Sequence, residues 1–285
     1  MRLKTYLTED RSKELKTQEA IDLLLSKHKQ AFWYSFNNQK YIYRGVKTPI
    51  GDIIYTDPKK STPRKSIHQV PNYYTLIMSN SPQWKQYPPR EYSIICATTS
   101  RNAKNYGMVY YTFPEDAAKI GVVPAADLWS VSIKETGGFD RLAKSIDSLL
   151  KVALGPGDYD SKYSQFRKAC KDFDTSWKTE KFHKNEDKKD FIREIERQLN
   201  WGATDLLEKY EKDGKNNLWK LLNNIIDPKN AKADGAPFRL IKIGDRLPDN
   251  NELWTDSPCI LIHTIVYPEL AELVKNQFDQ KLYKI

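Results

Sequence analysis

Three hydroxyl side chains, those of Thr98, Thr99 and Ser100, follow a short apolar run at residues 92–97 that is rich in β-forming residues. The run is long enough for one buried strand, and Ser100 is a typical N-cap for a short helix over residues 101–106. Hydroxyls and backbone N–H groups at such a strand-to-helix corner can bind a polar ligand. The same residue types also cap helices where no ligand binds, so the cluster alone leaves both interpretations open.

A second candidate lies upstream, where Arg44 and Gly45 stand in a β-rich run at residues 41–46. Glycine in a strand allows the backbone to bend or a ligand to approach closely. Arg44 is equally consistent with an exposed strand arginine that pairs with a carboxylate. The segment 50–69 adds further basic residues, among them Arg64, and such a run either binds phosphates or is simply solvated.

The third candidate is Glu252, which follows a turn-rich segment at residues 247–251 and precedes Leu253 and Trp254. The strongest β-forming run of the chain comes next, at residues 259–266. Glu252 therefore stands at the entry to a strand, or alternatively it is a solvated turn carboxylate.

The elements that must position these residues follow from hydrophobic periodicity. Residues 17–30 predict a helix with Thr17 as its cap. The runs at 92–97 and 108–113 predict two strands that pair with each other. Between about residues 137 and 235 strand-like runs give way to amphipathic segments, which predict a helical insertion of three to five helices. The remaining expected elements are a strand at residues 238–243 and a closing helix at residues 268–282.

Length and composition set broader limits. With 285 residues, one or two domains are expected, and the 17 Tyr and 7 Trp can supply much of the core although apolar content is only 39%. The net charge of +9 favours anionic partners, which include DNA bound at a basic surface, but also suits ordinary solubility. The three cysteines are far apart and predict neither a zinc site nor a disulfide framework, so no metal is expected. No apolar run approaches the ~20 residues of a membrane span, so no membrane partner is expected.

The three candidate segments occur in an order that resembles the ADP-ribosyltransferase superfamily, in its branch with arginine, Ser-Thr-Ser and glutamate motifs. Tyr43-Arg44-Gly45 is similar to the first motif, Thr98-Thr99-Ser100 to the second and Asn250-Asn251-Glu252 to the third. The resemblance implies an α+β fold with a split β-sandwich core. That core covers residues 37–134 and 236–285, with an N-terminal helical segment at 10–36 and a helical insertion at 135–235 between the second and third motifs.

The resemblance also implies a reaction, the cleavage of NAD as a substrate and the transfer of ADP-ribose to a macromolecule. Arg44 would hold the NAD phosphates through its planar charged fork. Thr98 would orient the glutamate near the nicotinamide ribose, and Glu252 would stabilise the oxocarbenium character of the ribose as nicotinamide leaves. The residues implied to contact the dinucleotide are Arg44, Gly45, Thr98, Thr99, Ser100 and Tyr106.

Two positions depart from the family pattern. Thr98 replaces the usual first serine, which keeps the hydroxyl but adds a methyl group. Asn250 occupies the acceptor-side position where arginine-modifying members carry Glu or Gln, and an amide cannot act as a base at neutral pH. This departure counts against arginine as the acceptor and leaves open another side chain of a host protein or a nucleic-acid base.

The first nine residues resemble a different pattern, the N-terminal peptides of proteins packaged in the heads of large tailed bacteriophages. Those peptides end in Leu-x-Glu or Ile-x-Glu and are cut after the glutamate, which here would be Glu9 of Leu7-Thr8-Glu9. This resemblance implies a location inside the virion head and then in the host cytoplasm. The alternative is an ordinary frayed terminus.

Two other functions fit the same sequence. A non-enzymatic nucleic-acid-binding protein is consistent with the basic balance and the aromatic residues, and it predicts salt-sensitive DNA binding without NAD cleavage. An internal structural protein of the virion that retains a transferase-like fold without activity is the other alternative.

Overall fold

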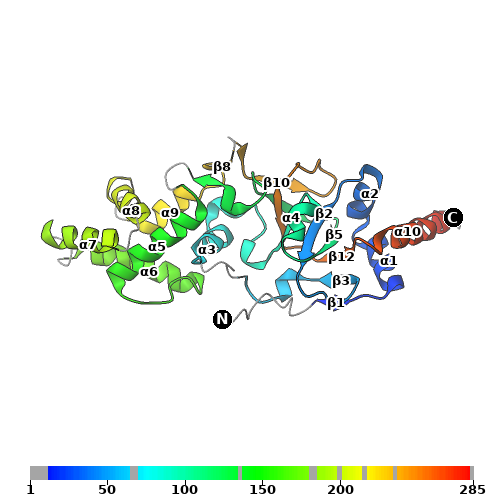
Figure 1. The fold of residues 1–285 in the computed structure, drawn as a ribbon, viewed down its shortest axis with the longest axis horizontal. Coiled ribbons are helices and arrows are strands. Elements are labelled where there is room, and N and C mark those ends of the chain that lie inside the picture. Colours follow the sequence, from blue (N-terminus) through cyan, green and yellow to red (C-terminus); the bar gives the residue numbers. More distant parts are fainter. Residues whose placement is uncertain are drawn as a thin grey trace. The chain divides into compact units, whose positions relative to one another are not determined.

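The structure is a computed structural model that describes residues 12–64, 70–133, 137–179, 185–197, 201–213, 217–233 and 236–282. The chain forms two compact units (Figure 1). The first contains the residues up to Arg64, residues Tyr87–Asp127 and the residues from Arg239 onward, and the second contains Lys65–Gln86 and Leu128–Phe238. The candidate peptide at residues 1–9 lies outside the described residues.

The described elements make the fold α+β. The helices are α1 (Thr17–Ser26), α2 (Lys29–Asn38), α3 (Tyr73–Asn80), α4 (Ser100–Lys104), α5 (Phe139–Leu154), α6 (Tyr163–Lys178), α7 (Asn185–Arg197), α8 (Trp201–Lys212), α9 (Leu218–Ile225) and α10 (Tyr267–Leu282). The strands are β1 (Lys13–Glu14), β2 (Ile42–Val46), β3 (Ile53–Thr56), β4 (Ile94–Ala97), β5 (Met108–Pro114), β6 (Lys119–Val122), β7 (Ser132–Ile133), β8 (Ala231–Ala233), β9 (Ala236–Pro237), β10 (Arg239–Lys242), β11 (Glu252–Thr255) and β12 (Cys259–His263).

The first unit is built on a nine-stranded antiparallel sheet with the order β1-β3-β12-β5-β2-β4-β11-β6-β10. The pairing of β2 with β5 extends from Ile42↔Thr112 to Val46↔Met108. The register of β2 with β4, in contrast, consists of the single pair Tyr43↔Ala97. The sheet is therefore weakly joined between β2 and β4, and the two strands part beyond this pair.

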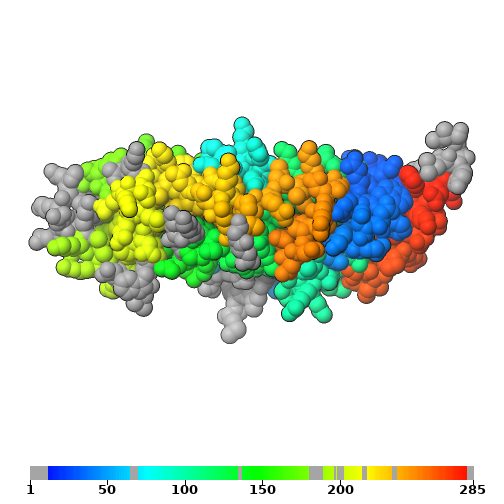
Figure 2. All heavy atoms as spheres, turned by 90° about the horizontal axis from the view of Figure 1, so that it is seen from above, coloured from blue at the N-terminus to red at the C-terminus, as the bar shows by residue number. Residues whose placement is uncertain are grey.

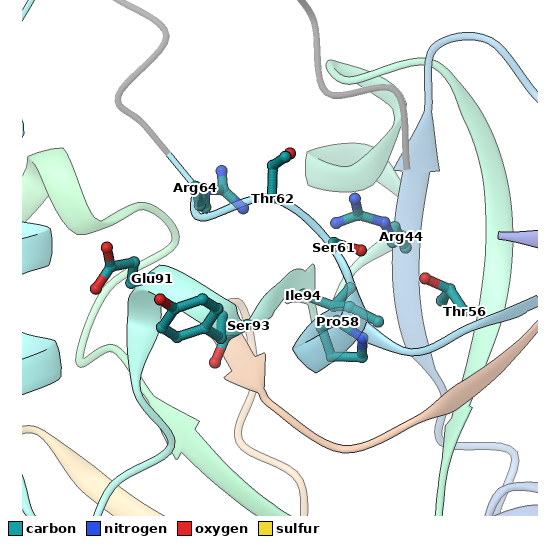
Figure 3. A pocket seen from close by; sticks show the side chains of 10 residues that line it. Arg44, Thr56, Pro58, Ser61, Thr62, Arg64, Glu91, Ser93 and Ile94 are labelled. Carbon is teal, nitrogen blue, oxygen red and sulfur yellow. The ribbon is translucent and has the colours of Figure 1, made fainter. Parts of the chain in front are cut away.

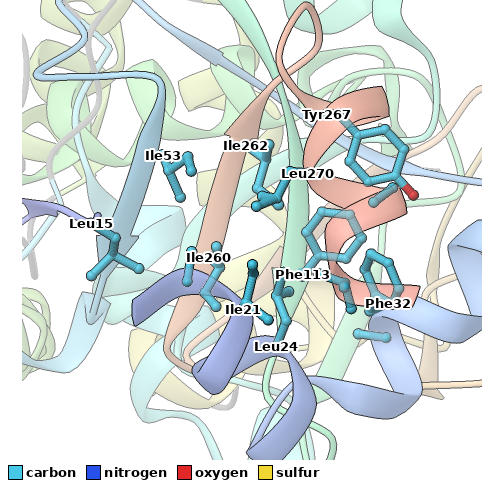
Figure 4. Packing of buried hydrophobic residues seen from close by; sticks show 14 residues of the cluster. Leu15, Ile21, Leu24, Phe32, Ile53, Phe113, Ile260, Ile262, Tyr267 and Leu270 are labelled. Atoms are coloured by element: carbon cyan, nitrogen blue, oxygen red, sulfur yellow. The ribbon is translucent and has the colours of Figure 1, made fainter. Parts of the chain in front are cut away.

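Side-chain alternation gives the strands β3, β5 and β12 one face that is covered by helices. Helices α1, α2 and α10 bury their apolar sides against this face (Figure 4). Helix α1 lies beside α10, so the two ends of the described chain meet in one layer (Figures 1 and 2). The core of this layer includes Ile21, Leu24, Phe32, Ile53, Phe113, Ile260, Ile262, Tyr267 and Leu270.

The other face of the strands forms a second core, and that core is shared across the weak junction. Ile42 and Leu261 come from one side of the β2–β4 pair, whereas Cys96, Val122 and Leu253 come from the other. One hydrophobic cluster contains them all, so the core on this face continues across the junction.

The second unit holds most of the helices and has an aromatic interior. The ring centroids of Phe173 and Tyr210 lie 5.1 Å apart, and those of Tyr73 and Phe166 lie 4.7 Å apart. The indole N–H of Trp84 donates to the carbonyl oxygen of Ile226 at 2.6 Å. These contacts place residues 73–84 with the helices, although the sequence had assigned them to the transferase-like core at 37–134. Strands β7, β8 and β9 form a small sheet in this unit.

Several expected elements occur with changes. Strands at 92–97 and 108–113 are present, but their predicted mutual pairing is wrong, because β4 pairs with β2 and β11 while β5 pairs with β2 and β12. The helix expected over 17–30 is two helices, α1 and α2, and Lys16 rather than Thr17 is the N-cap of α1. No helix among the described residues is long and apolar enough to span a membrane.

Candidate functional site

The three candidate segments lie on three strands that are immediate neighbours in the sheet, β2, β4 and β11. Tyr43 faces Ala97 across the first pair of strands, and Ala97 faces Glu252 across the second. Residues that stand opposite each other in an antiparallel pair point to the same face. The sheet therefore brings distant segments together: Thr98 and Asn251, which are 153 residues apart in the sequence, are in hydrogen-bond contact.

Arg44 lies where β2 and β4 part. Its Nη1 donates to the carbonyl oxygen of Ile95 at 2.7 Å. The side chain therefore links β2 to β4 where the two strands have no backbone pairing. Arg44 also lines a cavity of about 40 Å³ (Figure 3). The other lining residues are Thr56, Pro58, Ser61, Thr62, Arg64, Glu91, Tyr92, Ser93 and Ile94.

The lining of this cavity suits a small anion. Arg64 enters it from the loop after β3, and Figure 3 shows Arg44 and Arg64 reaching the same region from different segments. The backbone N–H of Arg64 donates to the carbonyl oxygen of Glu91 at 2.7 Å, which fixes the loop against the entry to β4. Two guanidinium groups among hydroxyl side chains can bind phosphate oxygens, and the volume accommodates about three water molecules.

Thr98 ties the end of β4 to the residue before Glu252. The Thr98 hydroxyl accepts a hydrogen bond from the backbone N–H of Asn251 at 2.7 Å, and the Thr98 N–H donates to the Asn251 carbonyl oxygen at 3.0 Å. The Asn251 side chain in turn donates to the carbonyl oxygen of Val123 at 2.7 Å. Thr98 therefore acts on Glu252 by fixing the backbone that carries it.

The corner after β4 differs by one residue from the expected one. Thr99, not Ser100, is the N-cap of α4, and its hydroxyl accepts from the N–H of Asn102 at 3.3 Å. Ser100 is the first residue of the helix and is exposed. Asn250 adopts a left-handed backbone conformation with φ of 55°, and its side-chain oxygen accepts from the Asn102 amide at 3.0 Å. The acceptor-side residue is thus fixed against α4.

Glu252 is the first residue of β11, and its carboxylate is buried. The Oε1 atom lies 2.5 Å from Nη2 of Arg90, and both side chains are at least nine-tenths buried, with 8% and 5% exposure. A buried carboxylate remains ionised at low cost only when a cation or several donors accompany it. Arg90 provides that cation, so Glu252 is not the solvated turn carboxylate of the alternative interpretation.

The ionisation of Tyr106 depends on charged groups from both the cavity and the buried ion pair. It follows α4, and its phenol lies 3.5 Å from a carboxylate oxygen of Asp127. Partial burial and the charges of Asp127 and Glu252 together raise the pKa of Tyr106 to about 12, and the charge of Arg64 opposes them. The phenol therefore lies within electrostatic range of both the buried carboxylate and the arginine of the cavity.

Gly45 lets β2 and the segment after α4 approach each other. A Cβ atom at this position would lie 2.0 Å from the carbonyl oxygen of Ala103 and 2.8 Å from the Cβ of Tyr106. The sequence suggested that Gly45 lets the backbone bend or a ligand approach closely. In the structure the segment of the chain around Tyr106 lies against Gly45.

The structure brings the three strands together but separates two of the side chains. Arg44 follows Tyr43 in β2 and points to the opposite face, toward Thr56 and Ile94 of the cavity. Glu252 shares the face of Tyr43 through the register with Ala97. Neither Thr98 nor Glu252 lines the cavity that contains Arg44.

Arg90 is the residue that sequence reasoning missed. It precedes the strand run at 92–97 and is 162 residues from Glu252 in the sequence. No local pattern marks such a pairing, although an arginine beside the entry to a central strand could have been tested as a partner for the isolated acid. Within the part of the chain that the structure describes, no group of three or more His, Cys, Asp or Glu could hold a metal ion.

Comparison of the chain with protein-family models, with curated proteins and with solved structures finds no match.

Proposed function

We propose that this protein is an NAD-dependent mono-ADP-ribosyltransferase. The observation that carries the proposal is the adjacency of β2, β4 and β11, which places the arginine, Thr-Thr-Ser and glutamate segments side by side in the order of their motifs. The core shared by the two halves of the sheet is also what a split β-sandwich would require.

In this proposal the cavity receives phosphate oxygens of NAD. Arg44 and Arg64 supply two permanently charged guanidinium groups, beside one carboxylate, that of Glu91. Nη1 of Arg44 also donates to the carbonyl oxygen of Ile95. A cavity of about 40 Å³ admits a small group and not a whole dinucleotide. The remainder of NAD is therefore assigned to the surface around Tyr106, where the charges of Arg64 and Glu252 both act.

The proposed role of Glu252 follows from glycosidic bond cleavage. Positive charge develops on the ribose as nicotinamide leaves, and a fixed carboxylate stabilises that charge most where water is excluded. Glu252 is buried and ionically paired, and Thr98 fixes the preceding backbone. Thr98 is thus assigned an indirect role, through Asn251.

The acceptor is proposed to be a host macromolecule, and the position of Asn250 bears on which one. Its amide oxygen is engaged by Asn102, and a side-chain amide provides no base for activating an acceptor arginine. An acceptor that is itself nucleophilic or that brings its own base fits this arrangement best. Mass spectrometry of the labelled product identifies it.

The direct test is incubation with labelled NAD and a host extract, with Glu252→Gln beside the parent. We expect transfer by the parent and a loss of about 100-fold or more in the variant, since the transition-state charge loses its carboxylate. Glu272→Gln is the matched control, because Glu272 is an exposed acid on α10, and it should retain parental transfer.

Equal background signals from the parent and from Glu252→Gln would contradict the proposal. Salt-sensitive DNA binding in the same preparation would then favour the nucleic-acid-binding alternative. An inactive protein that is retained in purified virions would favour the structural alternative.

Packaging in a phage head, followed by entry into the host cytoplasm, is a separate part of the proposal. It rests on Leu7-Thr8-Glu9, which lies outside the described residues. The intact mass of the protein taken from virions should correspond to a chain that starts at Asp10. A mass that includes Met1 would contradict the processing.

A further inference from the structure

We propose that Arg90 is a positioning residue for Glu252, whose carboxylate it holds in one orientation for the reaction. This inference rests on the proposed function, because it assigns Arg90 a part in the chemistry of the same carboxylate. Arg90 is not one of the residues that the family resemblance marks.

The contact between the two residues is short, buried and between opposite charges. Nη2 of Arg90 lies 2.5 Å from Oε1 of Glu252, and the whole residues are 4% and 6% exposed. Charge-assisted hydrogen bonds of this kind are stronger than neutral ones and restrict geometry. A carboxylate that is removed from water in this way has its orientation determined by its partner.

Arg90 is itself held from a second direction. Its guanidinium carbon lies 5.6 Å from the ring centroid of Trp254, within the range of a cation–π contact. Trp254 is two residues after Glu252 in β11, so both side chains project from the same face of the strand. The guanidinium therefore contacts two side chains of one strand face.

Trp254 is fixed in turn by the segment that leads into Arg90. Its indole N–H donates to the carbonyl oxygen of Pro88 at 2.9 Å, and its ring stacks on Tyr87 with centroids 5.8 Å apart and an interplanar angle of 14°. Residues 87–90 and strand β11 thus form a closed set of contacts around the ion pair. The ion pair restricts the rotation of the Glu252 carboxylate about its side-chain bonds.

Two roles for this pair can be separated by experiment. If the pair serves only folding, loss of Arg90 lowers the amount of native protein and leaves the turnover of each native molecule unchanged. If Arg90 positions Glu252, native protein that lacks it retains NAD binding and loses turnover, because a small misplacement of a catalytic group costs rate.

The experiment measures kcat and KM for NAD cleavage in Arg90→Met and Arg90→Lys, with the native fraction determined by circular dichroism. We expect kcat to fall about 100-fold in Arg90→Met with KM within about threefold of the parent, as for an interaction that matters in the transition state. Arg90→Lys retains the charge and should recover kcat to within about tenfold of the parent. Arg239→Met removes an exposed arginine of β10 and should leave both constants unchanged.

A double variant shows whether Arg90 acts through Glu252. In the Glu252→Gln background, Arg90→Met should cause no further loss of kcat, since residues that act as one unit are not additive. This double variant also removes both buried charges, so it keeps the test available if Arg90→Met alone does not fold. In that case Arg90→Lys is made in the parent and in Glu252→Gln. It must lower kcat in the parent and leave the kcat of Glu252→Gln unchanged.

The outcomes separate the two proposals. A parent protein that cleaves no NAD overturns the proposed function, and the role of Arg90 falls with it. An active parent with parental kcat in native Arg90→Met overturns the positioning role alone. An equal loss of kcat in the presence and absence of Glu252 also overturns it, because Arg90 would then act independently of the carboxylate.

Discussion

At the scale of single residues, Tyr106 reports on the charges that surround the candidate site. Its phenol lies near Asp127, and its ionisation depends on Asp127, Glu252 and Arg64 together. Burial and the two carboxylates all favour the neutral phenol, and they raise its pKa to about 12. Removal of one of these negative charges must therefore lower the pKa of Tyr106.

We expect Asp127→Asn to lower the pKa of Tyr106 from about 12 toward its ordinary value of about 10. The measurement is the ultraviolet absorbance of the protein as the pH is raised. The titration of the same protein with Tyr106→Phe is subtracted from it, so that the difference reports Tyr106 alone. Asp22→Asn, which removes an exposed acid of α1, is the control and should not move the midpoint.

The same pKa has a consequence for stability. An unfolded tyrosine loses its proton near pH 10, whereas the folded Tyr106 keeps it to about pH 12. The contribution of Tyr106 to the free energy of unfolding is therefore complete below pH 10 and is lost as the pH rises to about 12.

If the titration midpoint of Tyr106 is the same with and without the Asp127 carboxylate, the phenol does not sense that charge and the described geometry of Tyr106 is contradicted.

Sequence reasoning was most informative for residues whose neighbours in the chain determine their setting. The hydroxyl cluster at residues 98–100 was predicted to end a strand and cap a helix, and the structure moves the cap by only one residue, to Thr99. The role of Thr98 toward Asn251 and that of Arg90 toward Glu252 depend on contacts across more than 150 residues. Local residue types contain no information about which distant segment completes such a pair.

At the scale of elements, strand composition predicted where strands lie but not how they pair. Residues 108–113 and 92–97 are close in the sequence, and a hairpin between them was the simplest expectation. Strand β2 instead inserts between β5 and β4, because its pairing with β5 satisfies a full ladder from Ile42 to Val46. Most of helix α2 (Lys29–Asn38) lies beyond the single helix expected over residues 17–30, although it falls within the helical segment expected over 10–36. Its buried Phe32 packs with distant segments of the chain, which local composition does not reveal.

An element-scale prediction concerns Asp174 of α6, which joins three helices of the second unit. Its Oδ1 accepts from the Tyr210 hydroxyl at 3.0 Å and from the backbone N–H of Leu218 at 2.8 Å, so it links α6 to α8 and to the start of α9. Asp174→Ala leaves two buried donors without this acceptor. We expect the free energy of unfolding to fall by about 2 kcal/mol, measured by urea denaturation.

Asp172→Ala is the matched control for Asp174→Ala, because it removes the same side chain two residues away on α6. Asp172 pairs with Lys168 at 2.6 Å on the exposed side of the helix. Exposed ion pairs contribute little, so this variant should change the free energy of unfolding by less than about 0.5 kcal/mol. Equal effects of the two substitutions would show that the link through Tyr210 and Leu218 is not important for stability.

At the scale of the whole molecule, the chain passes between its two units repeatedly, and each unit keeps its own core. The sheet unit encloses the cluster around Leu253 and Leu261, and the helical unit encloses the rings around Phe173 and Tyr210. Units with separate cores can unfold in separate steps, and a two-state description then fails. The helical insertion was predicted from the loss of strand-like runs. The inclusion of residues 73–84 in this unit depends instead on contacts with Phe166 and Ile226, much later in the chain.

We therefore expect calorimetry to show two thermal transitions that can be shifted independently. Asp174→Ala should lower the midpoint of one transition. Gly45→Ala should lower the other, because its new Cβ would lie 2.0 Å from the carbonyl oxygen of Ala103, a backbone atom that cannot easily move. Overpacking of this kind costs about 1–3 kcal/mol, which corresponds to a shift of about 2–12 °C for domains of this size. A single transition that both substitutions lower together would show that the two units unfold as one and that their separate cores are not independently stable.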